Sequence, residues 1–273
     1  MKIAATEAAF EGFRLSRRRP GAVALWGAVW LVGLIAMLLA VMPLLAPHMG
    51  ELGASGGDPA KLSPAATAAM QRITWVTIPV LILLQAVLAP AVYRAVLRPQ
   101  EKSFASLRVG RDEGRLLIVA LVVGCVSAVA NVGGEIIVNA SVAGGGMIVG
   151  ALVWLVVTGV TIWLSVRLCL IAPLSFHRRR LAFVEGWKVT RPLFWPLLGL
   201  NIIVFALAAV VVLLLILIGW PLQVVMASGG PASPGAAIGA LLILILLPLG
   251  MAMVSTLLWA PFAAICRDIP ESR

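Results

Sequence analysis

The stretch FVEGWKVTR, residues 183–191, decides how the chain is organised, because similar stretches occur at two other places. Residues 10–17 are FEGFRLSR, and residues 104–111 are FASLRVGR. Each copy has Phe first, then a small residue before a large apolar one, a cation, Leu or Val, a second small residue and a final Arg. A long apolar run follows every copy. The pattern predicts a tandem repeat whose units all have the same order.

A second pattern closes each unit, where an Ala-Pro pair near the end of an apolar run is followed by Arg. The three examples are LAPAVYR (88–94), IAPLSFHR (171–178) and WAPFAAICR (259–267). Because Pro lacks an amide hydrogen, we expect each pair to bend the helix that ends there. The residues that we assign to the span exits are Pro90, Arg94, Arg167, Pro173 and Pro261.

Apolar blocks make up most of the chain, which is 62% hydrophobic and only 12% charged. Soluble domains have about 25% charged residues, and a bilayer span needs about 20 apolar residues. We therefore predict an all-α integral membrane protein whose six transmembrane helices form three tandem hairpins, each preceded by a short interfacial amphipathic helix. The six blocks are 21–46, 73–97, 116–140, 147–174, 193–222 and 236–266.

The hairpins belong to one predicted membrane domain, residues 1–273. The Gly-rich segment SVAGGG (141–146) predicts a tight turn inside the second hairpin. Residues 47–71 are rich in Gly, Ala and Pro, and they predict an irregular loop with one helical turn near its end. The predicted repeats cover about 5–98, 101–178 and 179–269.

The positive charges predict the orientation of the chain. Of the 21 Lys and Arg residues, all but Lys61 and Arg72 fall before the first block, near or after the end of the second or fourth block, or at the end of the chain. The positive-inside rule places those segments in the cytoplasm, so both termini are expected to be cytoplasmic. The net charge of +10 then reflects membrane topology, and it does not indicate nucleic-acid binding.

The three repeated stretches are predicted to be membrane-surface helices. Such a helix buries its large apolar side chain at the depth of the lipid headgroups and points its cations at anionic lipid. The expected partners are therefore membrane lipids with anionic headgroups on the cytoplasmic side. Plain anchoring and the binding of one specific lipid are both compatible with this pattern. The predicted anchors are Phe13, Arg14, Arg17, Leu107, Arg108, Arg111, Trp187, Lys188 and Arg191.

Residues 166–195, VRLCLIAPLSFHRRRLAFVEGWKVTRPLFW, resemble a known pattern. The pattern belongs to the six-span membrane domain that is fused to some bacterial glycerophosphoryl diester phosphodiesterases, and to related stand-alone inner-membrane proteins. The resemblance implies a bacterial inner-membrane location. It does not imply phosphodiesterase activity, which belongs to a separate soluble barrel. Pro192 stands where the pattern usually has Gly. The shared elements are an Arg before an LAP-like end, a basic stretch, and then Trp187, Thr190, Arg191, Phe194 and Trp195.

The chain contains none of the common catalytic motifs: no nucleophile elbow, phosphate-binding loop, zinc-protease helix or dinucleotide fingerprint. Its two His residues, His48 and His177, are expected on opposite sides of the membrane. Cys125, Cys169 and Cys266 have no spacing typical of a disulfide framework or a zinc site. We therefore expect no metal, no cofactor and no enzymatic activity.

A polar stripe runs along the third apolar block at steps of four residues: Ser127, Asn131, Glu135 and Asn139. An ionisable side chain inside a span usually marks a functional site, so a path for a solute or a proton is one interpretation. Hydrogen bonding between helices, or a position in an outer vestibule, is the other.

Arg167 lies about 24 Å from Glu135 in depth, given a helical rise of about 1.5 Å per residue, so the two are not expected to pair. We expect Arg167 to reach the headgroups or to bind a carbonyl that is freed near Pro173.

The sequence therefore favours a non-enzymatic inner-membrane protein with a structural or lipid-interacting role. The alternative is a transporter or channel for a small solute or a lipid-like molecule, which would use the polar stripe.

Overall fold

The computed structural model describes residues 5–56, 58, 61–100, 110–228, 233–267 and 269, and this part of the chain contains helices and no strand. Five helical segments are long and apolar enough to cross a membrane, which confirms the coarse prediction of an all-α membrane-type fold. The long helices are α3 (Pro20–Leu45), α5 (Pro64–Leu97), α6 (Arg111–Leu168), α9 (Phe194–Ser228) and α10 (Pro234–Arg267). The short ones are α1 (Ala5–Ala9), α2 (Glu11–Arg18), η1 (Ala46–His48), α4 (Met49–Ser55), α7 (Ile171–Arg178) and α8 (Phe183–Thr190).

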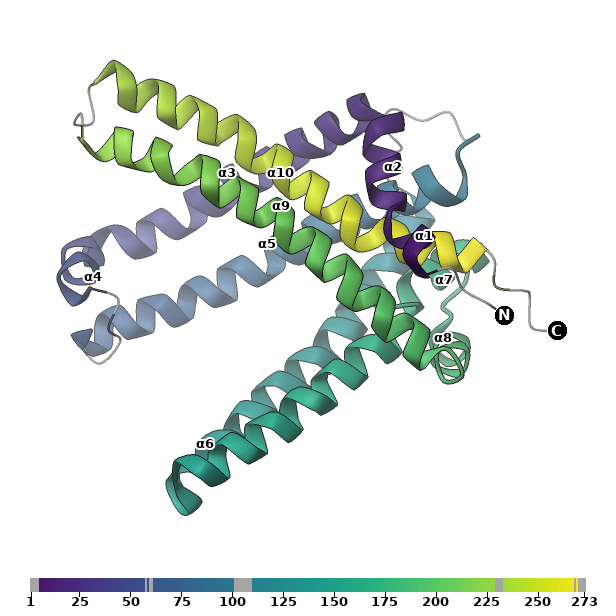
Figure 1. Ribbon diagram of the computed structural model, residues 1–273. Coiled ribbons are helices and arrows are strands. Elements are labelled where there is room, and N and C mark those ends of the chain that lie inside the picture. The colour runs from purple at the N-terminus through teal and green to yellow at the C-terminus, as the bar shows by residue number, and fades with distance from the viewer. Residues whose placement is uncertain are drawn as a thin grey trace.

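Helix α6 consists of two arms that fold back on each other at Gly146. This residue has φ 76° and ψ −179°, a conformation outside the helical region that Gly adopts without steric cost. A Cβ atom added to Gly134 would collide with the side chain of Val157, which comes from the other arm. The two arms therefore lie side by side, as Figure 1 shows, and the reversal falls in the predicted segment 141–146.

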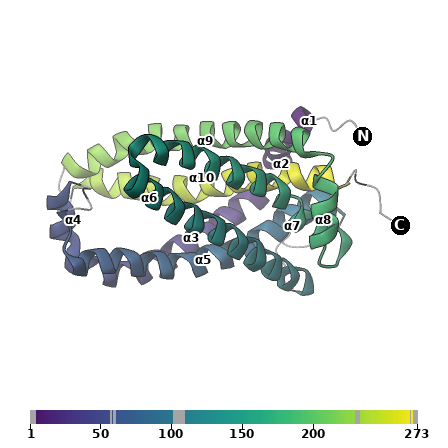
Figure 2. The ribbon, with the colours of Figure 1, turned by 90° about the horizontal axis from the view of Figure 1, so that it is seen from below.

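The long helices form three pairs: α3 with α5, the two arms of α6, and α9 with α10 (Figure 1). The pairs meet at one end of the molecule and diverge towards the other. Figure 2 shows α1, α2, α7 and α8 at the end where the pairs meet, which we call the closed end. Helix α4 lies at the opposite, open end. Helix α10 is central, since it packs against α9, α3, α5 and α2.

The buried core lies towards the closed end. One cluster includes Trp26, Leu88 and Tyr93 from α3 and α5, and a second includes Leu174 from α7 and Leu200 from α9. Towards the open end the helices expose apolar side chains in several directions. Only 11% of the most apolar window of α6 is buried, so most residues of this window keep part of their surface exposed.

The connection between α3 and α5 differs from the prediction. Residues 47–71 were predicted to be irregular except near their end, but helical turns occupy the start of this segment, in η1 and α4. Helix α4 ends at Gly56, whose left-handed φ of 61° is typical of a helix C-terminus. Ser63 caps α5 by accepting a hydrogen bond from the Ala66 amide, and the Glu51 carboxylate accepts hydrogen bonds from the Ser63 amide and hydroxyl. These bonds hold α4 against the start of α5.

The Ala-Pro pairs also behave differently from one another. Helices α5 and α10 continue through Pro90 and Pro261 without a break in the helix. Only in the second unit is the helix interrupted, at Cys169–Leu170, shortly before Pro173. The missing amide of Pro173 leaves the carbonyl at residue 169 without its usual intrahelical partner, and Pro90 and Pro261 remove the same bond without interrupting their helices. The helix is therefore interrupted only in the second unit, and bending at Pro90 and Pro261 stays a prediction.

Candidate functional site

Two of the repeated stretches form short helices that dock through Gly. Helix α2 lies against α10 so closely that a Cβ atom on Gly12 would be 2.8 Å from the Leu257 Cα. Helix α8 lies against the start of α7, where a Cβ atom on Gly186 would be 2.9 Å from the Ile171 Cγ1 and 3.2 Å from its Cα. The first small residue of the repeated pattern therefore permits close approach of two helices.

The second small residue of the pattern forms polar contacts with a neighbouring helix, which is α10 for Ser16 and α6 for Thr190. The Ser16 hydroxyl lies 3.2 Å from the Thr256 hydroxyl of α10. The Thr190 hydroxyl accepts a hydrogen bond from Arg167 Nη1 at 3.3 Å. Its single hydrogen has two acceptors in reach, the Trp187 carbonyl at 3.1 Å and the Arg167 carbonyl at 3.3 Å. Helix α2 therefore docks on α10 through both its Gly and its hydroxyl, whereas α8 places its Gly against α7 and its hydroxyl against the end of α6. The predicted anchors Leu107 and Arg108 lie outside the described residues.

The predicted anchors that the structure describes fall into two groups. The large apolar members are partly covered: Phe13 is half-buried and Trp187 is 36% exposed. The cationic members have exposed side chains. These are Arg14, Arg17, Arg111, Lys188 and Arg191.

A buried ion pair joins α5 to the first turn of α6. Arg94 is only 2% exposed and pairs with Glu113, while the neighbouring Arg98 pairs with Asp112 at 3.2 Å. Arg98 also donates to the Phe176 carbonyl at 3.1 Å, and its guanidinium lies 4.6 Å from the centre of the Phe176 ring. These contacts connect α5, α6 and α7 at the closed end.

A second ion pair joins α7 to α8. Glu185 forms ion pairs with Arg178 at 3.2 Å and with Arg180 at 2.8 Å. The side chain of Arg178 is almost fully covered. Sequence reasoning identified the arginines at the span exits but missed the acids that face them. The signal was present, because an acid stands near the start of the unit that follows Arg94, at Glu113, and of the unit that follows Arg178, at Glu185.

Arg167 has a different environment. It is 6% exposed, and its guanidinium lies 4.3 Å from the centre of the Trp187 ring and 5.7 Å from that of Trp163. The two rings meet edge to face at 5.7 Å. The Arg167 Nη1 donates a hydrogen bond to the Thr190 hydroxyl, whereas the buried Arg167 Nε has no hydrogen-bond partner in the described part of the chain. The guanidinium is therefore covered by aromatic rings. Of the two alternatives expected for Arg167, binding of a carbonyl near Pro173 is wrong, and reaching the lipid headgroups stays a prediction.

The four residues of the predicted polar stripe lie in different environments. Ser127 lines a cavity of about 370 Å³ where the three pairs meet. Asn131 is exposed and donates to the Ser127 carbonyl at 2.7 Å, and Glu135 and Asn139 are exposed and lie outside the lining of this cavity. The polar side chains that the structure brings to Ser127 come from α5, from α9, from the second arm of α6 and from the residue that follows this arm. They are Gln85, Tyr93, Ser165, Cys169 and Asn201.

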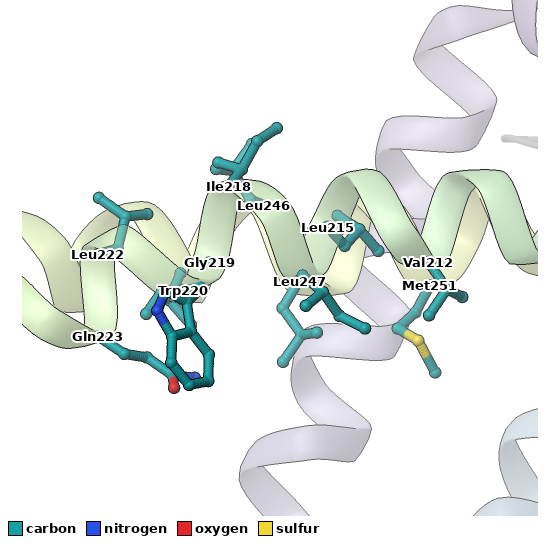
Figure 3. A pocket seen from close by; sticks show the side chains of 12 residues that line it. Val212, Leu215, Ile218, Gly219, Trp220, Leu222, Gln223, Leu246, Leu247 and Met251 are labelled. Atoms are coloured by element: carbon teal, nitrogen blue, oxygen red, sulfur yellow. The ribbon is translucent and has the colours of Figure 1, made fainter.

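A second cavity, of about 270 Å³, lies between α9 and α10 and is almost entirely apolar. Figure 3 shows its lining, in which Leu215, Leu247 and Met251 occupy one part, and Trp220 and Gln223 lie close together in another. A lining of this kind suits a hydrocarbon chain and offers few groups for a polar ligand.

The residues that the structure describes contain no group of three His, Cys, Asp or Glu side chains that could hold a metal ion. The family resemblance of residues 166–195 stays a prediction. Comparison of the chain with protein-family models, with curated proteins and with solved structures gives no match.

Proposed function

We propose that this is a non-enzymatic, lipid-interacting integral membrane protein that holds phospholipid between three helical hairpins. The proposal rests on the exposure of large apolar side chains along the diverging parts of all three helix pairs. Examples are Leu39 in α3, Trp154 in α6 and Leu217 in α9. Soluble proteins rarely expose apolar surfaces of this extent to water. Lipid acyl chains are as apolar as the side chains that they would cover.

In this proposal the chain crosses the membrane six times, through α3, α5, the two arms of α6, α9 and α10. The close helix contacts made by Gly12 and Gly186 at equivalent positions of the first and third stretches support a tandem repeat. Nearly all Lys and Arg residues are expected on one side of the membrane. By the positive-inside rule, this supports a cytoplasmic location for the closed end and for both termini. The resemblance of residues 166–195 supports a bacterial inner membrane.

Lipid retention tests the proposal. The protein is extracted in mild detergent, washed through successive detergent exchanges and analysed by native mass spectrometry, with a monomeric membrane protein of similar mass as the control. We expect phospholipid to remain on this protein after the control has lost it, because lipid between the pairs is enclosed by protein on more than one side. Complete loss of lipid at the same step as the control, with no change in stability, would contradict the proposal.

A second candidate function is passage of a small solute, and the polar cavity at the meeting point of the three pairs favours it. Gln85, Ser127 and Asn201 place amide and hydroxyl groups there without any charge. On this hypothesis, Ser127→Phe or Asn201→Leu abolishes the uptake phenotype that the wild-type gene restores to a deletion strain, because both residues line the cavity. Full complementation by both variants would remove the support for transport.

A further inference from the structure

Three arginines at the closed end have covered side chains, but their electrostatic partners differ. Arg94 pairs with Glu113, and Arg178 pairs with Glu185. Arg167, which is 6% exposed, has no carboxylate within ion-pair distance among the described residues. The acid on the adjacent helix α8 is Glu185, which is already held between Arg178 and Arg180.

The contacts of Arg167 leave most of its hydrogen-bonding capacity unused. A guanidinium has five N–H donors, and here one nitrogen bonds the Thr190 hydroxyl while the buried Nε bonds nothing. The Trp187 ring attracts the cation through its face but accepts no conventional hydrogen bond. Removing a cation from water is costly unless an anion or several hydrogen-bond acceptors compensate. Among the residues that the structure describes, Arg167 has one such acceptor and no carboxylate, so its positive charge is left without a negative partner.

The surroundings of Arg167 identify the direction from which an anion would come. Trp163 and Trp187 are both partly exposed, and Trp residues prefer the level of the lipid headgroups. Three exposed residues of α6 precede Arg167 in the chain at helical spacing: Trp163, Val160 and Val156. We call these three residues the apolar track.

We propose that Arg167, together with Thr190 and Trp187, binds the phosphate group of a phospholipid, whose acyl chain lies along the apolar track. The planar guanidinium fork matches two phosphate oxygens, and Nε is one of the donors that such a bidentate contact uses. The track continues directly from the cation into the apolar part of the helix, which fits a lipid headgroup better than free phosphate. This site rests on the proposed lipid-interacting function and assigns it a position.

The test is the thermal unfolding of detergent-purified, delipidated protein after addition of phosphatidylglycerol, diacylglycerol or sodium phosphate. The variants are Arg167→Met and Arg167→Lys, with Arg191→Met as the control, because Arg191 is an exposed cation next to Thr190. We expect phosphatidylglycerol to stabilise the wild type. Arg167→Met should raise the half-saturating concentration at least about tenfold, since a charge-assisted contact is lost. Arg191→Met should raise it much less, and Arg167→Lys should give an intermediate value.

A readout without lipid separates a ligand site from a structural arginine. If Arg167 awaits an anion, Arg167→Met should be at least as stable as the wild type in lipid-free detergent, because an uncompensated buried charge has been removed. A clear loss of lipid-free stability would instead assign Arg167 a structural role and contradict the proposal. Thr190→Val offers a milder variant that keeps the cation and removes the Thr190 hydroxyl.

The remaining outcomes are also decisive. Equal responses of the wild type and Arg167→Met to phosphatidylglycerol would contradict the site and leave the proposed function intact. Stabilisation by diacylglycerol equal to that by phosphatidylglycerol would exclude recognition of phosphate. Stabilisation by sodium phosphate alone, dependent on Arg167, would make the ligand a soluble anion and the lipid assignment wrong. Absence of any lipid response in the wild type would count against the proposed function itself.

Discussion

Gly12 and Leu257 come from opposite ends of the chain, yet α2 and α10 approach so closely here that a Cβ atom on Gly12 would lie 2.8 Å from the Leu257 Cα and 2.9 Å from the Thr256 carbonyl oxygen. Both obstructing atoms belong to the backbone, so neither can move away as a flexible side chain would. This contact attaches the first helices of the chain to its last one.

Gly12→Ala should therefore lower the free energy of unfolding by about 1–3 kcal/mol, the range typical of overpacking. The measurement is the unfolding temperature in detergent, followed by intrinsic fluorescence. Gly21→Ala is the matched control, since a Cβ atom on Gly21 has no neighbour within 4 Å. Ala should be neutral or favourable there, in the first turn of α3. Equal unfolding temperatures for the two variants would show that α2 does not lie against α10 in this way.

Gly186→Ala should destabilise the junction of α8 with α7, and a second substitution should partly reverse the effect. The closest obstacle is the Ile171 Cγ1, at 2.9 Å, which Ile171→Ala removes. In a double-mutant cycle we expect the pair of substitutions to cost less than the sum of the single ones, because the two residues are in contact. Strict additivity of the unfolding free energies would contradict the contact.

Removing one partner of the buried pair between Arg94 and Glu113 should be more harmful than removing both. Arg94→Met alone leaves Glu113 buried without its partner, a change that typically costs about 3–5 kcal/mol. Arg94→Met combined with Glu113→Leu should recover a large part of that loss. Chemical unfolding in mixed micelles measures the three variants, and a double variant less stable than Arg94→Met would overturn this account of the pair.

The link between α4 and α5 predicts a local effect at the open end. Ser63→Ala removes the cap on the Ala66 amide and one of the hydrogen bonds to Glu51, and a lost N-cap typically costs about 1 kcal/mol. Hydrogen exchange should become faster in the first turn of α5 and in α4, while the core around Leu88 keeps its protection. Faster exchange throughout the molecule would mean that this link is part of the global unfolding unit.

The sequence allows the helical class and the reversal inside α6 to be predicted, because both depend on local properties. Long apolar blocks specify membrane-length helices, and the run of Gly before residue 147 specifies a turn. The divergence of the pairs could not be predicted in this way. Helices such as α3 and α9 are apolar on all sides, so their sequences do not indicate which face packs against a neighbour.

The candidate site was only partly predictable for a related reason. The repeated pattern identified Gly12, Gly186 and Thr190 as small positions, but not the helices against which they pack. The environment of Arg167 depends on Trp187 and Thr190 from another helix, so spacing along α6 alone could not predict these contacts of its side chain. Non-local pairs of this kind require the arrangement of the helices in space.

Labelling from one side of the membrane tests the central claim most directly. Lys61→Cys places a thiol at the open end and Leu181→Cys places one at the closed end, both at exposed positions, in a Cys125→Ser background that serves as the unlabelled control. In intact spheroplasts, an impermeant maleimide should label Lys61→Cys, and it should label Leu181→Cys only after the membrane is opened. Labelling of both positions from outside, or of Leu181→Cys alone, would contradict a chain that crosses the membrane with its closed end in the cytoplasm.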